Sequence, residues 1–316
     1  MNKTTYDKPE FSLLLLHPKY WPVWLGFGLL ALIVNLLPYR VLLSLGQRIG
    51  LLGVRFGKKR VDIATRNMEL AFPEKPIEEI NQLVKENFKN TGLALIETGI
   101  TWFWPTWRFK MLLVDKDTAV MRSHSKNGKG VLLCCVHALN LEITARAFAV
   151  LGQHGYGVYR PHNNAVYNLI QFWGRTHNGN LTIDRKDVKK MIRVLRNGDR
   201  LFYLPDHDYG RNKSVFVPFF AVEDASTTTG TSILAYTSRC AIVIGSGFRN
   251  ADGKYEIMAD ESIEDNYPQK DEKAAAAYMN RYLEKIILRA PEQWMWLHKR
   301  FKTMEDPEAE KGIRYK

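Results

Sequence analysis

An uncharged run of twenty residues between Lys19 and Arg40, YWPVWLGFGLLALIVNLLPY, constrains this chain more than any other feature. As a helix that rises about 1.5 Å per residue, the run reaches roughly the 30 Å thickness of a bilayer's hydrocarbon core. Tyr20, Trp21 and Trp24 stand at one end and Tyr39 at the other, where aromatic rings favour the headgroup layer. We therefore expect an N-terminal arm over residues 1–19 and a membrane anchor helix over residues 20–39.

Basic residues are more numerous after this run than before it, and this bias predicts that the C-terminal body lies in the cytoplasm. The basic residues that follow are Arg40, Arg48, Arg55, Lys58, Lys59 and Arg60. The sequence Pro38-Tyr39-Arg40 lacks the small residues of a signal-peptide cleavage site. An interfacial helix that does not span remains the alternative, because Pro22 and Asn35 shorten the apolar core. The apolar stripe that follows, from Val41 to Phe56, could lie on anionic lipid.

Charge and cysteine content narrow the class of protein. Lys and Arg outnumber Asp and Glu by 45 to 33, and the net charge of +12 favours a nucleic acid, an anionic membrane surface or an acidic protein as partner. The three cysteines form no CxxC pair and no even-numbered framework. This argues against a disulfide-stapled secreted domain and against a zinc module.

The rest of the chain changes from a helical to a mixed pattern. Residues 40–104 read as a helical, membrane-proximal region, with apolar positions three to four apart from Pro76 onward. After residue 128, short apolar runs predict strands: GVLLCCVH, YGVYRP, LTIDR, RLFYLPDHD, SVFVPFF and CAIVIGSGF. Helical stretches lie between several of these runs, and a final helix is expected around 274–289. Residues 105–316 are therefore expected to form one α/β body with a mixed, largely parallel sheet flanked by helices.

Four polar residues close predicted strands: His137, Arg160, Arg185 and Asp206. Ligands of open α/β sheets bind at the carboxyl ends of the strands, so we expect these side chains to share one rim. In HALNLE, a strand–turn–helix reversal could bring the Glu142 carboxylate to one imidazole nitrogen and leave the other to accept a hydroxyl proton. A structural histidine is the alternative, because this spacing arises by chance in a chain of such composition.

HALNLE resembles the HX4(D/E) box of the glycerolipid acyltransferase superfamily. The sequence around it resembles the late acyltransferases of lipid A biosynthesis, especially the lauroyl (HtrB-type) branch. Segments along nearly the whole chain carry the resemblance: LLHPKYWPVWLGFG, RNMELAFPE, ETGITWFWP, GVYRPHNN, DRKDVKKMI, PDHDYG, SVFVPFFAV, TTTGT and PEQWMWLHKRFKT. This chain has glutamate where many superfamily members have aspartate.

The resemblance implies a glycerol-3-phosphate acyltransferase-like fold and a bacterial inner-membrane enzyme with its catalytic body on the cytoplasmic side. The implied donor is a fatty acyl group, lauroyl or similar, on acyl carrier protein, and the implied acceptor is a hydroxyl of the Kdo-bearing tetra-acylated lipid A precursor. His137 and Glu142 would be the general base pair. No cofactor, no metal and no nucleic acid are implied, and the basic charge would meet acidic carrier protein, the lipid A precursor and anionic inner-membrane lipids.

Further residues are assigned by position. We expect Arg160, Arg185, Asp206 and Asn140 at the substrate, although Arg160 and Arg185 could instead form salt bridges at the rim, with Asp184 or Asp187 as the partner of Arg185. Contact with membrane or carrier protein is expected for Lys58, Lys59, Arg60, Trp294, Trp296, Lys299 and Arg300. The two tryptophans could instead fasten the C-terminal region to the body.

Three alternatives concern the chemistry. Adjacent residues of PDHDYG point to opposite sides, which disfavours a metal there. The segment Thr227–Thr231 could receive a phosphate or merely cap a helix. Cys134 and Cys135 fall in a buried strand, so direct transfer is expected without an acyl-cysteine intermediate. Acylation of a lysophospholipid or glycerol phosphate, and a non-catalytic membrane adaptor, are the rival functions.

Overall fold

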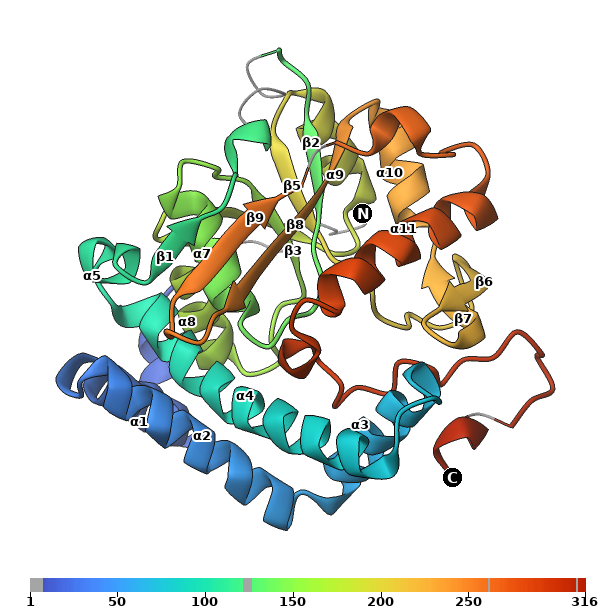
Figure 1. Cartoon of the computed structure of the whole chain (residues 1–316). Helices are drawn as coiled ribbons and strands as arrows, with labels where there is room; N and C mark the ends of the chain where they lie inside the picture. Colours follow the sequence, from blue (N-terminus) through green and yellow to red (C-terminus); the bar gives the residue numbers. More distant parts are fainter. Residues whose placement is uncertain (1–7, 122–126, 261, 311) are drawn as a thin grey trace.

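A seven-stranded, mostly parallel sheet with helices on both faces forms the centre of the molecule (Figure 1). The computed structural model describes residues 8–121, 127–260, 262–310 and 312–316. The strand order is β1–β9–β8–β2–β5–β3–β4; β8 and β9 run antiparallel, and the other neighbours run parallel. The strands are β1 (Leu113–Asp115), β2 (Val131–Cys134), β3 (Tyr156–Tyr159), β4 (Leu181–Asp184), β5 (Arg200–Tyr203), β8 (Ala241–Arg249) and β9 (Tyr255–Ala259). The expected α/β class is confirmed.

The helices fall into an N-terminal group and a group that covers the sheet. The first group comprises α1 (Trp21–Leu36), α2 (Tyr39–Phe56), α3 (Lys58–Ala71) and α4 (Ile77–Phe103). The second comprises α5 (Thr106–Lys110), α7 (Leu141–Val150), α8 (Ala165–Thr176), α9 (Val188–Arg196), α10 (Gly230–Ser238) and α11 (Glu272–Ile287). Short 3-10 turns are η1 (Leu13–Leu16), η2 (Pro18–Tyr20), η3 (Glu264–Asn266), η4 (Pro291–Gln293) and η5 (Ile313–Tyr315).

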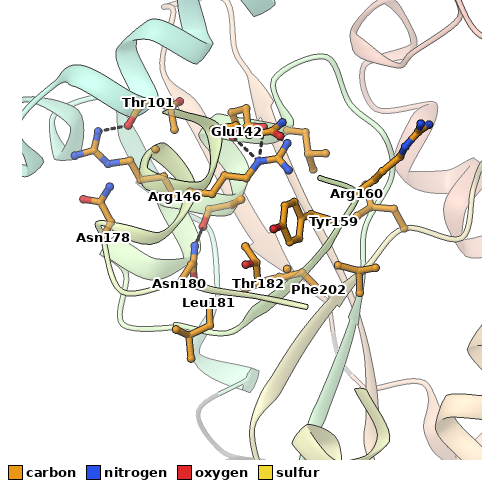
Figure 2. Close-up of a pocket in the computed structure, with 18 of the residues that line it drawn as sticks. Thr101, Glu142, Arg146, Tyr159, Arg160, Asn178, Asn180, Leu181, Thr182 and Phe202 are labelled. Atoms are coloured by element: carbon orange, nitrogen blue, oxygen red, sulfur yellow. Dashed lines mark hydrogen bonds and ion pairs between the residues drawn. The ribbon is translucent and has the colours of Figure 1, made fainter. Parts of the chain in front are cut away.

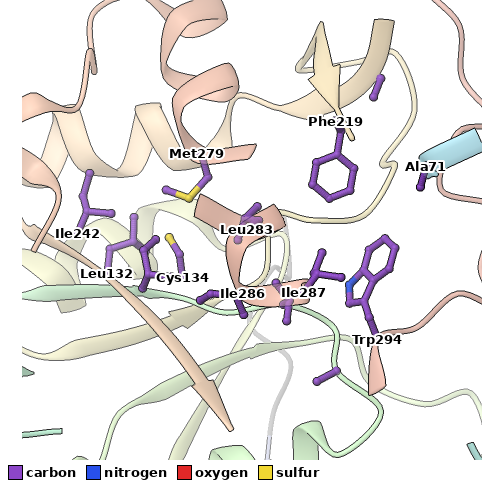
Figure 3. Close-up of a cluster of buried hydrophobic side chains, with 14 of the residues drawn as sticks. Ala71, Leu132, Cys134, Phe219, Ile242, Met279, Leu283, Ile286, Ile287 and Trp294 are labelled. Carbon is purple, nitrogen blue, oxygen red and sulfur yellow. The ribbon is translucent and has the colours of Figure 1, made fainter. Parts of the chain in front are cut away.

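Two hydrophobic cores lie on opposite faces of the sheet because successive strand residues point in opposite directions. In β2, Val131 and Leu133 pack in the core that contains α7, whereas Leu132 and Cys134 pack in the core that contains α9, α10 and α11. Figure 3 shows the second core, where side chains of α11 lie over the sheet near Leu132 and Cys134. Near-continuous burial of β2 and β8 follows from this two-sided cover.

The 27-residue helix α4 joins the N-terminal helices to the sheet (Figure 1). Helix α2 crosses it closely at three glycines, because a Cβ on Gly92 would lie 2.2 Å from the carbonyl oxygen of Gly46 and from the nitrogen of Gly50. Leu42 is fully buried in this crossing. The apolar stripe of α2 is therefore divided: part of it packs on α4, and Val41, Leu52 and Phe56 remain exposed.

The carboxyl end of α4 is held by the buried guanidinium of Arg146. Its Nη1 donates to the carbonyl of Thr101 at 2.6 Å, and its Nη2 donates to the carbonyl of Trp104 at 2.9 Å. A cation at a helix C-terminus is favoured by the helix dipole and satisfies carbonyls that lack an intrahelical partner. This interaction fixes the last turn of α4, including Trp102, against α7.

Most predicted elements of the body are present. The runs GVLLCCVH, YGVYRP, LTIDR, RLFYLPDHD and CAIVIGSGF contain β2, β3, β4, β5 and β8, and the expected helices correspond to α7, α8, α9 and α11. SVFVPFF contains β6 (Ser214–Phe219), which pairs with β7 (Val222–Thr228) in a separate hairpin outside the main sheet. The polar strand β7 and the sheet's β1 and β9 were not predicted.

Candidate active site

His137 and Asp206 meet at the carboxyl ends of neighbouring strands. Cys134 of β2 pairs with Tyr203 of β5, and each chain continues three residues to the site. The Nδ1 atom of His137 lies 2.7 Å from Oδ1 of Asp206, and the backbone N–H of His137 donates to Oδ2 at 2.7 Å. The carboxylate thus fixes both the backbone and the ring of the histidine.

Glu142 does not orient His137, in contrast to the expectation from HALNLE. Its carboxylate pairs with the guanidinium of Arg175, whose Nε donates to Oε1 at 2.9 Å and whose Nη2 donates to the same oxygen. The indole of Trp102 donates to Oε2 at 3.0 Å. Because α7 begins at Leu141, its first turn directs Glu142 toward α8 and α4 rather than back onto the imidazole. The Glu142 carboxylate raises the pKa of Arg175, although burial opposes this shift.

The sequence predicted that Asp206 contacts substrate or pairs with a rim arginine. Asp206 is instead fully buried and does neither. A third donor, the indole Nε1 of Trp294, reaches its Oδ2 at 2.7 Å. Burial alone would raise the pKa of Asp206, but the charge and hydrogen bonds of His137 outweigh burial and hold this pKa well below its usual range. Asp206 is therefore a permanent anion that orients His137.

Trp294 and Trp296 are fully buried, so the expectation that they meet lipid or carrier protein is wrong. Their segment fastens the site: the N–H of Met295 donates to the carbonyl of His137 at 3.1 Å, and Ala138 bridges to Trp294. The alternative assignment, attachment of the C-terminal region to the body, is the one observed. Arg300 is also buried, at 1% exposure, and donates to the carbonyl of Ser226, which removes it from the surface contacts.

A cavity of about 330 Å³ opens beside His137 (Figure 2). Residues of α7 and α8 form one wall, and residues of β3, β4 and β5 form the other. Figure 2 shows Glu142 and Arg146 on the helical side and Leu181, Thr182 and Phe202 on the strand side. Its lining combines apolar side chains with the Glu142–Arg175 ion pair. Arg175 was missed from the sequence, since the helix predicted at 165–173 stops two residues short of it.

A second cavity, of about 580 Å³, adjoins the first and shares with it His137, Val158, Tyr159, Arg160 and Leu204. It contains Arg160 and Arg185, which the sequence placed on the same rim, together with Lys302. Both arginines are exposed, and among the residues that the structure describes no carboxylate forms an ion pair with either of them. The alternative salt bridges at the rim are therefore not formed. His137 lines both cavities and is half-buried between them, with 23% of its side chain exposed.

Three imidazole rings form a column in the second cavity. The rings of His137 and His207 stack with centroids 3.5 Å apart, and His298 stacks on His207 at 4.8 Å. Burial, reinforced by repulsion from His137, His298 and Arg300, lowers the pKa of His207 to about 3, although Asp206 opposes this shift. His207 is therefore a neutral aromatic surface under the ring of His137 at physiological pH.

His137, Asp206 and His207 bring three metal-ligating side chains within 4.8 Å of one another. Both oxygens of Asp206 already accept hydrogen bonds from N–H groups of His137 or Trp294, so this carboxylate has little capacity left to bind a cation. These hydrogen bonds favour the role of Asp206 in orienting the histidine.

Asn140 is the residue directly before α7, at the N-cap position, but its side chain does not cap the helix. The amide is buried, at 2% exposure, and neither its oxygen nor its nitrogen has a hydrogen-bond partner. The possible phosphate site at Thr227–Thr231 is not open: Thr227, Thr229 and Thr231 are buried, and the hydroxyl of Tyr203 lies against Gly230.

Cys134 and Cys135 are buried, and burial raises the pKa of both thiols, to about 12 for Cys135. Both thiols therefore stay protonated and are poor nucleophiles.

Lys58, Lys59 and Arg60 are exposed at the start of α3, where Lys58, Lys59 and the half-buried Lys299 line a basic depression of about 750 Å³.

Comparison with known proteins gives consistent matches over nearly the whole chain. Residues 8–303 match the family model for bacterial lipid A biosynthesis acyltransferases. The chain is 45% identical over 295 residues to the lipid A biosynthesis lauroyltransferase of Escherichia coli K12, which covers 93% of this chain and 96% of that protein. It is 41% identical to the palmitoleoyltransferase of the same organism, over 94% and 96% of the two chains, and 27% identical to its myristoyltransferase, over 96% and 93%.

The depressed pKa of His207 predicts a pH dependence of stability. Below about pH 6.5 the unfolded chain binds a proton at this imidazole, whereas the folded chain does not do so until about pH 3. The free energy of unfolding should fall as pH drops below 6.5, by up to about 1.4 kcal/mol per pH unit from this residue. His207→Asn should reduce that slope in unfolding experiments between pH 7.5 and 4.5. The exposed His154→Asn should keep it, and equal slopes for wild type and His207→Asn would contradict the assignment.

Proposed function

The chain belongs to the bacterial lipid A biosynthesis acyltransferases, and we propose that it moves a fatty acyl chain, lauroyl or similar, from acyl carrier protein to a hydroxyl of the Kdo-bearing tetra-acylated lipid A precursor. The 45% identity to a lauroyltransferase supports the chain-length class. The observation that carries the chemical proposal is the hydrogen bond of 2.7 Å between His137 and Asp206 at the junction of two cavities.

His137 acts as the general base through Nε2, since Nδ1 is engaged by Asp206. The acceptor hydroxyl gives its proton to Nε2 as its oxygen attacks the thioester carbonyl, and Asp206 stabilises the imidazolium that forms. Collapse of the tetrahedral intermediate expels the carrier thiolate, which receives the proton from His137. Asp206 replaces Glu142 as the partner in this mechanism. Transfer is direct, because the thiols nearest the site are buried and protonated.

The donor's acyl chain occupies the first cavity. Its apolar walls, including Leu181 and Phe202, suit a hydrocarbon chain, and its volume lies within the range of ligand sites. Arg175 lines the same cavity, and Glu142 holds its guanidinium in place. A fixed cation near the reacting carbonyl would stabilise the negative charge that develops on its oxygen. Glu142 therefore contributes by positioning Arg175 rather than by activating His137.

The acceptor's anionic groups occupy the second cavity. Arg160, Arg185 and Lys302 bring three positive charges to one side of His137, and the planar guanidinium groups match phosphate and carboxylate oxygens. The acceptor hydroxyl would then reach His137 from the second cavity. No cofactor or metal takes part in this scheme.

The basic surface around Lys58, Lys59, Arg60 and Lys299 is proposed to meet acidic carrier protein or anionic lipid headgroups. The catalytic body lies on the cytoplasmic side of the inner membrane, where acyl carrier protein is found. The apolar segment Pro18–Leu36 meets the length and composition of a membrane helix and supports membrane attachment.

Removal of the base tests the function directly. Purified wild-type protein, incubated with lauroyl-acyl carrier protein and the tetra-acylated precursor, should give a singly acylated product by mass spectrometry. His137→Ala should lower the rate about 10²- to 10⁴-fold, the usual cost of losing a positioned base. The exposed His154→Ala is the matched control and should keep full activity. Product from a lysophospholipid but not from the lipid A precursor would overturn the proposed acceptor.

The partner of His137 is tested by the pH profile of kcat/KM. Asp206→Asn removes the charge that favours the protonated ring, so the acidic limb of the profile should move to lower pH and kcat should fall. Glu142→Gln leaves the His137–Asp206 pair intact, so its acidic limb should stay in place while its rate falls. Movement of the limb in Glu142→Gln, with none in Asp206→Asn, would restore Glu142 as the partner.

Binding of the acceptor is tested by charge removal at the rim. Arg160→Ala and Arg185→Ala should each raise the apparent KM for the lipid A precursor several-fold and leave the KM for the acyl carrier protein donor nearly unchanged. Arg193→Ala, on the exposed surface of α9, removes the same charge away from the cavity and serves as the control. An equal rise in KM for both substrates would remove the assignment.

A further inference from the structure

Helix α1 is attached to the catalytic body along its whole length. In the first turns of the helix, the indole of Trp24 donates to the carbonyl of Leu15 at 2.8 Å, and Leu15 is itself buried before the helix. In the middle, Phe27 stacks on Trp102 of α4, with ring centroids 5.6 Å apart. At the carboxyl end, Val34 is fully buried, and its carbonyl accepts a hydrogen bond of 2.7 Å from the indole of Trp104. The helix contacts α4 and α8 of the body and the preceding turn η2.

The opposite face of α1 is an exposed apolar stripe. Its members recur every three or four residues and are more than half exposed: Trp21 (55%), Leu25 (71%), Leu29 (58%), Leu32 (55%) and Leu36 (70%). Further exposed apolar residues are Phe11, Leu13, Leu14 and Leu16 before the helix and Val41, Leu52 and Phe56 on α2. So much exposed apolar surface on a folded body indicates an interaction site.

The geometry of α1 does not suit a span. The segment Pro18–Leu36 is long enough to cross a bilayer, so its packing rather than its length decides the orientation. A perpendicular helix would carry its neighbours in α4 and α8 into the bilayer. Among these, Trp102 contacts Phe27 on one side and the Glu142–Arg175 ion pair on the other. Charged groups at the centre of a bilayer are costly.

Release of α1 from the body is equally unfavourable. It would expose Leu30 and Val34, which pack around Gly99 of α4, and would break the hydrogen bond from Trp104. It would also uncover Trp102, which is 1% exposed. The contacts are retained, and the apolar stripe is covered, if the helix lies parallel to the membrane plane.

Charge on the flanking surface is complementary to anionic lipid. The exposed basic residues in the N-terminal helices are Arg40, Arg48, Arg55, Lys58, Lys59 and Arg60. Cations beside an apolar face are the pattern of helices that lie at the boundary between headgroups and acyl chains. The partner that fits both features is the surface of an anionic bilayer.

We infer that α1 lies in the plane of one leaflet, with its exposed apolar stripe among the acyl chains, and does not cross the membrane. Both ends of the apolar segment are then on the same side as the catalytic body. That this side is the cytoplasm rests on the proposed function. This inference follows the interfacial alternative rather than the spanning anchor expected over residues 20–39.

Cysteine accessibility in intact cells tests this arrangement. The native cysteines are buried, so single cysteines can be introduced in the full chain at the exposed Lys8, before the apolar segment, and Lys58, after it. In spheroplasts, a membrane-impermeant maleimide should label neither Lys8→Cys nor Lys58→Cys, and in inside-out vesicles it should label both. Labelling of Lys8→Cys alone in spheroplasts would show a span and overturn the inference. Labelling of both in spheroplasts would instead place the body outside the cytoplasm and overturn the proposed function.

A matched pair of leucines tests burial of the stripe in lipid. Leu29 on α1 and Leu288 after α11 are 58% and 55% exposed. In inside-out vesicles, Leu288→Cys should react with the maleimide and Leu29→Cys should be protected, whereas both should react once the protein is extracted into detergent and diluted. Equal reaction of the two in vesicles, or recovery of the protein in the soluble fraction, would overturn the inference.

Discussion

The buried carboxylate of Asp206 is the interaction on which the site depends. It accepts hydrogen bonds from the backbone and ring of His137 and from the indole of Trp294, so three segments distant in the sequence meet at one anion. A buried charge is tolerated only when it is paired and hydrogen-bonded, and each of these donors meets that need. Loss of any one would leave charge unsatisfied in the core, which ties the integrity of the fold to the orientation of the histidine.

The C-terminal segment is held in place by polar side chains of the N-terminal helices. Asn67 of α3 donates to the carbonyls of Trp296 and His298, and Asn87 of α4 donates to the carbonyl of Trp294 at 2.7 Å. Both amides are fully buried. The helical region therefore supports the active site directly, because it fixes the segment whose indole completes the shell around Asp206.

Sequence periodicity was sufficient to predict five of the sheet's seven strands and the rim, but not the pairing within the rim. Buried parallel strands are continuous apolar runs, and their carboxyl ends gather the polar residues, so His137, Arg160 and Arg185 were expected together and line one cavity. The choice between Glu142 and Asp206 required the strand order, since β2 lies beside β5 only through long-range pairing. Proximity in the sequence favoured Glu142. The direction of the first turn of α7 favours Asp206.

Tertiary packing also decides what the apolar segment can do. Its composition indicates contact with a membrane, but its packing against the body restricts how it can be oriented there. Trp102 makes this link physical: one face of its ring stacks on Phe27 of α1, and its indole donates to Glu142, which holds Arg175 in the cavity wall. A Cβ on Gly174 would lie 2.4 Å from this ring, so the helix that carries Arg175 closes on the tryptophan without space for a side chain. Helix α1 and the wall of the first cavity are therefore parts of one packed unit. Displacement of α1 relative to the body would therefore disturb Trp102 and, through its hydrogen bond, the Glu142–Arg175 ion pair.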